Sequence, residues 1–134
     1  MTMVEYALTF LGTPYLWGGN TPQGWDCSGF ICEVLRAYGH LDRNDFSSQM
    51  IYDQLVKMNT RSQLSLGSVL FFGESRSSIT HVSMAIDEKG TLMVESGGGD
   101  SKTTTLKAAQ EQNAFVRIRP INSRRDLVGC IKII

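Results

Sequence analysis

Residues 25–35 read Trp-Asp-Cys-Ser-Gly-Phe-Ile-Cys-Glu-Val-Leu, and the rest of the predicted fold is organised around them. The apolar residues of this stretch recur at helical spacing and share one face, and these are Phe30, Ile31, Val34 and Leu35. Asp26 is a good N-cap residue, which places Cys27 in the first turn of the predicted helix. Backbone N–H groups are unpaired there, and the positive end of the helix dipole favours a thiolate over a thiol. Cys27 therefore lies where a fold would hold a nucleophile, although a cysteine taken alone is more often a small buried residue.

Length and composition are those of an ordinary globular chain. With 134 residues the chain can bury a sizeable core, and we expect one domain over residues 1–134. Apolar residues make up 42% and charged residues 19%, which excludes a disordered chain. The formal net charge is zero, so the sequence does not indicate nucleic acid or an anionic membrane surface as a partner.

The cysteines and histidines are too few for a metal site. The three cysteines, Cys27, Cys32 and Cys130, form no CxxC pair, and the chain contains no HExxH motif. Cys27 and Cys32 would point to different faces of one helix, and we expect three free thiols. The sequence therefore predicts no bound metal and no cofactor.

The order of the elements predicts an α+β fold. Helices are expected first, over 3–11, 26–38 and 47–58. Strands are expected over 68–72, 81–86, 91–96, 114–119 and 127–134, with turns at 73–78 and 87–90 and a short helix over 105–112. Helices followed by an antiparallel sheet are typical of the α+β class.

Only two histidines are available as a general base. His40 lies in a polar link and is expected to be an exposed loop residue. His81 opens a strand, where a histidine taken alone is more often structural, but beside a helix-start cysteine it becomes a candidate base. A hairpin turning near Glu88 would place Glu95 directly across from His81. Glu95 could then accept the imidazole N–H and fix its tautomer, or it could be an exposed strand carboxylate.

Four segments together resemble the NlpC-type cell-wall cysteine peptidases. They are Thr-Pro-Tyr-Leu-Trp-Gly-Gly at 13–19, Asp-Cys-Ser-Gly-Phe at 26–30, Gly-Ser-Val-Leu-Phe-Phe at 67–72 and His-Val at 81–82. The resemblance implies a compact papain-like domain in which N-terminal helices pack on an antiparallel β-sheet. The nucleophile would lie at the start of the central helix. The activity implied is hydrolysis of peptidoglycan stem peptides, at the bond between a γ-linked D-glutamyl residue and a diamino acid.

The resemblance also implies a role for each matching residue. Cys27 matches the nucleophile and His81 the general base, while Glu95 falls on a third polar position that is often histidine in the family. Tyr15 would lie near the oxyanion, together with the backbone N–H of Cys27. Residues that bind substrate or line its subsite are implied at three further positions, Trp17, Asp26 and Ser28.

Departures from the family pattern leave the substrate preference open. The usual Pro-Gly-Asp before the sheet is Leu66-Gly67-Ser68, and residues 82–85 read Val-Ser-Met-Ala in place of Val-Gly-Ile-Tyr. An amidase that separates peptide from glycan, or an acyl transferase, would use the same scaffold. A component that binds wall peptides without turnover is an alternative of another class.

The N-terminal residues bear on how the protein would reach its substrate. They lack a basic n-region, and no apolar run approaches a membrane-spanning length, so we expect no export signal and no membrane partner. A leaderless domain of this type resembles those encoded by phages or mobile elements. A phage tail or virion protein is therefore a candidate partner, with action at the bacterial cell wall.

Overall fold

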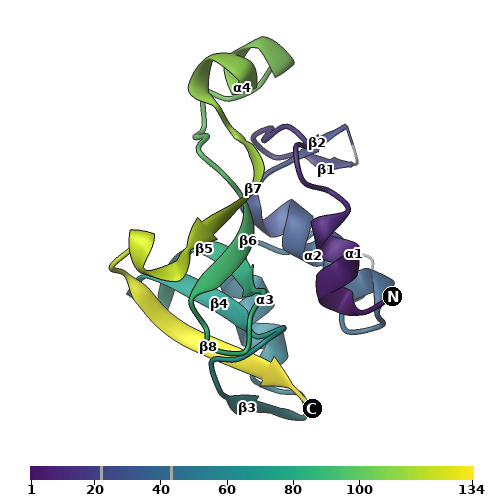
Figure 1. The fold of residues 1–134 in the computed structure, drawn as a ribbon, viewed down its shortest axis with the longest axis vertical. Coiled ribbons are helices and arrows are strands. Elements are labelled where there is room, and N and C mark those ends of the chain that lie inside the picture. Colours follow the sequence, from purple (N-terminus) through teal and green to yellow (C-terminus); the bar gives the residue numbers. More distant parts are fainter. Residues whose placement is uncertain (22, 43) are drawn as a thin grey trace.

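The computed structural model places three helices against one antiparallel sheet, while a fourth helix stands away from the body (Figure 1). It describes residues 1–21, 23–42 and 44–134. The helices are α1 (Met3–Leu8), α2 (Cys27–Ala37), α3 (Ser48–Leu55), α4 (Leu106–Gln112) and the 3-10 helix η1 (Ile121–Ser123). The predicted α+β class and the packing of helices on an antiparallel sheet are confirmed.

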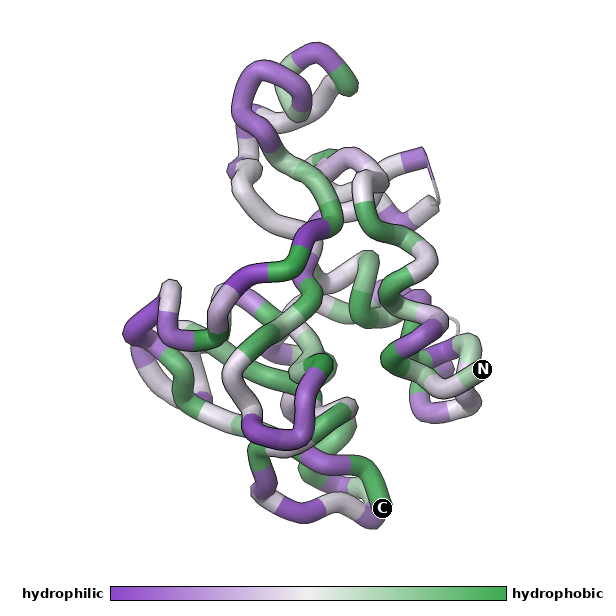
Figure 2. The backbone as a smooth tube through the Cα atoms, viewed as in Figure 1, coloured by the Kyte–Doolittle hydropathy of each residue, from purple (hydrophilic) through white to green (hydrophobic). Residues whose placement is uncertain are grey.

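The main sheet has six strands in the order β3-β8-β4-β5-β6-β7, all antiparallel. They are β3 (Thr60–Ser62), β4 (Val69–Ser75), β5 (Ser78–Ala85), β6 (Leu92–Gly97), β7 (Phe115–Pro120) and β8 (Leu127–Ile133). A separate two-stranded pair, β1 (Asn20–Thr21) and β2 (Gly24–Trp25), precedes α2. Apolar residues concentrate in the central strands and in α2, whereas α4 and the turns are largely hydrophilic (Figure 2).

Helix α2 begins where the sequence predicts. The Asp26 carboxylate accepts a hydrogen bond from the Gly29 N–H at 2.8 Å, so Cys27 is the first helical residue. The apolar face is buried as expected and packs against β5 and β6 in the main core, through Phe30, Ile31, Val34 and Leu35. The helix ends beside Gly39, whose φ of 76° suits a residue without a side chain.

Alternation along the strands divides the buried residues between two faces. Val82, Met84 and Val94 belong to the core beneath the helices. Leu70, Phe72 and Met93 belong to a smaller cluster formed with η1 and β8. Both faces of the first part of β4 are therefore buried, which is why residues 69–72 are continuously apolar.

Several predicted boundaries differ from the structure. The helices predicted over 3–11 and 47–58 are shorter because their last residues form i→i−3 turns, as in the Phe10 N–H bond to the Ala7 carbonyl. The turn predicted over 73–78 is tighter, since β4 continues to Ser75 and β5 begins at Ser78. Strands β1, β2 and β3 were not predicted, because they are short and their pairing depends on segments brought together by folding.

The predicted register of β5 with β6 is wrong by two residues. The structure pairs Met84 with Val94 and Ala85 with Met93, so His81 is not directly across from Glu95. The side-chain period of a strand is two, and a shift of two residues keeps every side chain on its predicted face. Glu95 therefore still points toward His81, which it reaches diagonally.

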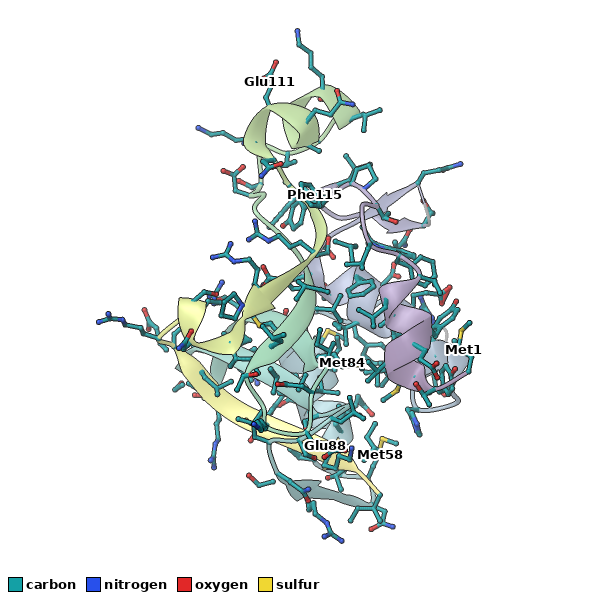
Figure 3. All side chains as sticks on the ribbon, viewed as in Figure 1. Met1, Met58, Met84, Glu88, Glu111 and Phe115 are labelled. Carbon is teal, nitrogen blue, oxygen red and sulfur yellow. The ribbon has the colours of Figure 1, made fainter. Side chains whose placement is uncertain are left out.

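The segment after β6 carries α4 away from the sheet before β7 returns to it. Glu111 projects outward from α4, and Phe115 lies below the helix at the start of β7 (Figure 3). Near the start of β7, the Gly12 N–H donates a hydrogen bond to the Val116 carbonyl at 2.9 Å, which ties this strand to the segment after α1. No helix in the described ranges is long and apolar enough to cross a membrane.

Replacement of Phe71 by alanine tests the core. Phe71 is fully buried and its ring meets the Tyr52 ring edge-on at 5.1 Å. We expect Phe71→Ala to lower the free energy of unfolding by about 3–5 kcal/mol in a denaturant titration, because a cavity is left. Leu106→Ala on α4 is the control, since Leu106 is 54% exposed. An equal loss in both variants would contradict this packing.

Candidate active site

Cys27 is held at the meeting point of α2, α3 and the sheet. Its Sγ lies 3.6 Å from the Oγ of Ser48, the first residue of α3. The Ser96 hydroxyl on β6 donates to the Trp25 carbonyl at 2.8 Å and ties the start of α2 to the sheet. Backbone pairing between β5 and β6 is restricted to two residue pairs, and the start of α2 lies beyond them.

A chain of three polar side chains begins at His81. The imidazole Nε2 lies 2.8 Å from Oε1 of Glu95, and the second carboxylate oxygen accepts a hydrogen bond from Arg117 Nε at 2.9 Å. His81 is 8% exposed and Glu95 4%. Because Nε2 is engaged by Glu95, Nδ1 is the ring nitrogen left for Cys27, which lies beside His81 on the same cavity wall.

Gly97 is needed for the position of the Glu95 carboxylate. A Cβ at residue 97 would lie 2.6 Å from Glu95 Oε2 and 3.2 Å from Arg117 Nη2. Contacts this short are not tolerated, so any side chain at 97 would displace the ion pair. The glycine therefore provides the space in which Glu95 turns toward His81.

The charges of the site stabilise one another. Burial alone would raise the pKa of Glu95, but His81 and Arg117 outweigh it and lower that pKa to about 2. Burial would lower the pKa of His81, yet hydrogen bonding to Cys27 and Glu95 raises it to about 9. Burial would raise the pKa of Cys27, and the neighbouring His81 more than offsets this, so the pKa is lowered. The arrangement favours a thiolate beside an imidazolium.

A cavity of about 390 Å³ opens onto these side chains. Tyr15 and Trp17 line it, and the Tyr15 ring packs directly on the backbone of Gly99. Burial, together with the nearby Cys27 and Asp26, raises the pKa of Tyr15, so its hydroxyl stays protonated and can donate a hydrogen bond. The cavity is also lined by three arginines, Arg117, Arg119 and Arg124.

Asp26 and Ser28 do not line this cavity. The Asp26 carboxylate accepts hydrogen bonds from the N–H groups of Gly29 and Gly18, at 2.8 and 3.1 Å, and from the Ser28 hydroxyl at 3.1 Å. These contacts cap α2 and hold the preceding loop beside it. In the structure both residues support the position of Cys27.

Three contributors were missed by the sequence analysis, namely Ser48, Arg117 and Arg124. Arg117 could have been predicted, because it lies between the apolar residues Val116 and Ile118 and therefore points to the opposite face of its strand. That strand pairs with the strand of Glu95. Ser48 and Arg124 carried no signal, since they come from separate elements. No group of three or more His, Cys, Asp or Glu side chains that could hold a metal ion occurs in the described part of the chain.

Comparisons with known proteins identify similar sequences and folds. The model of the NlpC/P60 family matches residues 12–120. The γ-D-glutamyl-L-lysine dipeptidyl-peptidase of Bacillus subtilis is 33% identical over 119 residues, which make up 87% of this chain and 39% of that protein. The chain spans between a third and two fifths of the length of the curated relatives it matches first.

Solved structures of similar fold extend the comparison. The NlpC/p60 domain of the peptidoglycan hydrolase SagA has a TM-score of 0.69 and 22% identity, covering 98% of this chain and 96% of that domain. RipD of Mycobacterium tuberculosis, described as a non-catalytic NlpC/p60 domain protein adapted to peptidoglycan binding, has a TM-score of 0.61 and 16% identity. It is matched over 100% of this chain and 99% of that one. At these identities the likeness shows the fold alone.

Alkylation with iodoacetamide tests the lowered pKa of Cys27. Burial raises the pKa of Cys32 to about 11 and also raises that of Cys130, so at neutral pH only Cys27 should carry much thiolate. We expect peptide mapping to show Cys27 labelled first, at a rate that falls in a His81→Ala variant. Equal, slow labelling of all three cysteines would contradict the ion pair.

Proposed function

The chain belongs to the NlpC/P60 family, and on that basis we propose that it is a cysteine peptidase acting on the stem peptides of bacterial peptidoglycan. The observation that carries the proposal is the linked set of Cys27, His81 and Glu95 at one cavity. A nucleophile at a helix start, a base beside it and a third group that orients the base are the parts that thiol hydrolysis needs.

The proposed reaction proceeds through a thioester. The Cys27 thiolate attacks the scissile carbonyl, and the His81 imidazolium then donates its proton to the leaving amine. Water hydrolyses the acyl-enzyme, with neutral His81 accepting a proton from it. The Tyr15 hydroxyl and the backbone N–H of Cys27 would hold the developing oxyanion, since both are donors beside the sulfur.

Each remaining site residue has a proposed part. Glu95 keeps His81 in one tautomer and stabilises the imidazolium. Trp17, which is exposed at the cavity rim, would pack against the peptide. Asp26 and Ser28 would affect substrate binding indirectly, because they hold the preceding loop and the start of α2 in place.

The bond proposed for cleavage joins a γ-linked D-glutamyl residue to a diamino acid. Support comes from the name of the Bacillus subtilis relative and from the segments at 13–19 and 26–30. An amidase or acyl transferase on this scaffold would differ in its products alone. Delivery by a phage tail or virion protein stays a prediction from the sequence.

Binding of wall peptides without turnover is the second candidate function. It is favoured by the fold shared with RipD, which is described as non-catalytic. The paired thiol and imidazole of this chain favour catalysis, because a binding module has no need of a thiolate held by a buried ion pair.

Digestion of peptidoglycan and of soluble stem peptides, followed by mass spectrometry, tests the function. We expect new amine and carboxyl ends within the peptide, and no such products from Cys27→Ala, which lacks the nucleophile. Cys130→Ala is the matched control and should cleave normally, since Cys130 lies away from the cavity. Release of intact peptide from glycan would indicate an amidase, and no product from either active form would favour the binding module.

The pH profile of Glu95→Gln tests the orienting carboxylate. The charge of Glu95 helps raise the pKa of His81 to about 9, so its removal should move the alkaline limb of kcat/KM to lower pH. We expect a loss of roughly a hundredfold at neutral pH. Glu88→Gln, in an exposed turn, should leave rate and profile unchanged. An alkaline limb that does not move would assign Glu95 a purely structural role.

A further inference from the structure

We propose that Arg119 and Arg124 form a subsite for a carboxylate carried by the leaving half of the substrate. This inference rests on the proposed peptidase function and adds a chemical feature that the substrate must carry. It starts from the basic side chains that the catalytic step does not use.

Arg119 is a cation at this cavity that the proposed catalytic step does not use. It lines the cavity two residues along β7 from Arg117, so both guanidinium groups lie on the same side of the strand. Arg117 is engaged by Glu95, whereas Arg119 makes no ion pair or side-chain hydrogen bond with any residue that the structure describes. A half-buried guanidinium in a cavity is well suited to an anionic ligand, because charge-assisted bidentate bonds to carboxylates are strong.

Arg124 is held in a fixed position beside the same cavity. Its Nε and Nη2 donate to the two carboxylate oxygens of Asp126 at 3.0 and 2.8 Å. The guanidinium also lies over the Phe72 ring, 5.2 Å from the ring centroid. Nη1 is not used in either contact. A side chain oriented in this way loses little entropy when it donates to a ligand.

The position of Arg124 relative to His81 indicates which half of the substrate is bound. The Phe72 ring packs against the His81 imidazole at a centroid distance of 5.6 Å, and Arg124 lies over the same ring, so Arg124 is on the His81 side of the cavity. During acylation the acyl half stays on Cys27 Sγ, and the amine half leaves from the side where His81 supplies the proton. Groups on the His81 side of the cavity would therefore contact the leaving amino acid in the proposed reaction.

The ligand chemistry is a carboxylate close to the scissile amide. A leaving amino acid can provide it as a free α-carboxylate or as the second carboxylate of a dicarboxylic diamino acid. A γ-linked glutamyl residue also has a free α-carboxylate, but that group belongs to the acyl half. The carboxylate of the leaving half and the carboxylate of the acyl half can be distinguished by amidating one of them at a time.

Three tripeptides provide the test: L-alanyl-γ-D-glutamyl-L-lysine, its lysine carboxamide and its glutamyl α-carboxamide. The intact enzyme should cleave the free acid with a kcat/KM about tenfold above that of the lysine carboxamide, mainly through KM, as expected for one charge-assisted contact. Arg119→Gln and Arg124→Gln should each bring the ratio of these two kcat/KM values closer to one. Arg125→Gln, an exposed neighbour that does not line the cavity, should keep it.

Two results would overturn the subsite. One is a preference for the lysine carboxylate that survives in Arg119→Gln. The other is a preference for the free acid over the glutamyl α-carboxamide that is lost in the arginine variants. That result would mean that the arginines bind the acyl half. Arg119→Gln carries the test alone if Arg124→Gln fails to fold, since it removes no ion pair or side-chain hydrogen bond among the described residues.

Binding to Cys27→Ala separates the subsite from the reaction. If no tripeptide is cleaved by the intact enzyme, the proposed function fails, and calorimetry with this variant still decides the subsite. Tighter binding of the free acid than of the lysine carboxamide, abolished by adding Arg119→Gln, would support it. Equal binding of the two peptides would overturn it.

Discussion

The carboxylate of Glu95, shared between His81 and Arg117, is the interaction on which the site depends. Two hydrogen bonds of 2.8 and 2.9 Å fix its two oxygens, and burial strengthens both by excluding water. A buried carboxylate with one partner removed would be costly, so the three side chains hold one another in place. Gly97 is part of the same constraint, because the Glu95 carboxylate lies where a side chain at residue 97 would be.

Helix α2 supplies the other half of the arrangement. Its apolar face anchors it to β5 and β6, and Asp26 fixes the residue at which it begins. The Ser96 hydroxyl then joins the start of the helix to the strand that carries Glu95. The proposed nucleophile and base thus lie on two rigid elements, α2 and β5, which allows a thiolate and an imidazolium to stay close without a flexible loop.

The basic lining would give the cavity a second function besides holding the proposed nucleophile. In the proposed reaction Arg117 acts through Glu95, while Arg119 and Arg124 add positive charge to the same cavity. A family scaffold can change its substrate through such positions without altering the reacting atoms. Residues on β7 and on the segment after η1 can therefore set specificity while α2 and β5 preserve the chemistry.

Local sequence patterns predicted most of the elements and the chemical groups that they carry. Helical spacing and the cap at Asp26 predicted α2 and the place of Cys27, and period-two alternation kept Glu95 on the face of His81 despite a register that was wrong by two residues. Only the packing of separate elements brought Arg124 and Ser48 to the site and kept Asp26 and Ser28 from lining the cavity. Local patterns report which way a side chain faces on its own element, whereas distances between elements depend on packing that no short stretch encodes.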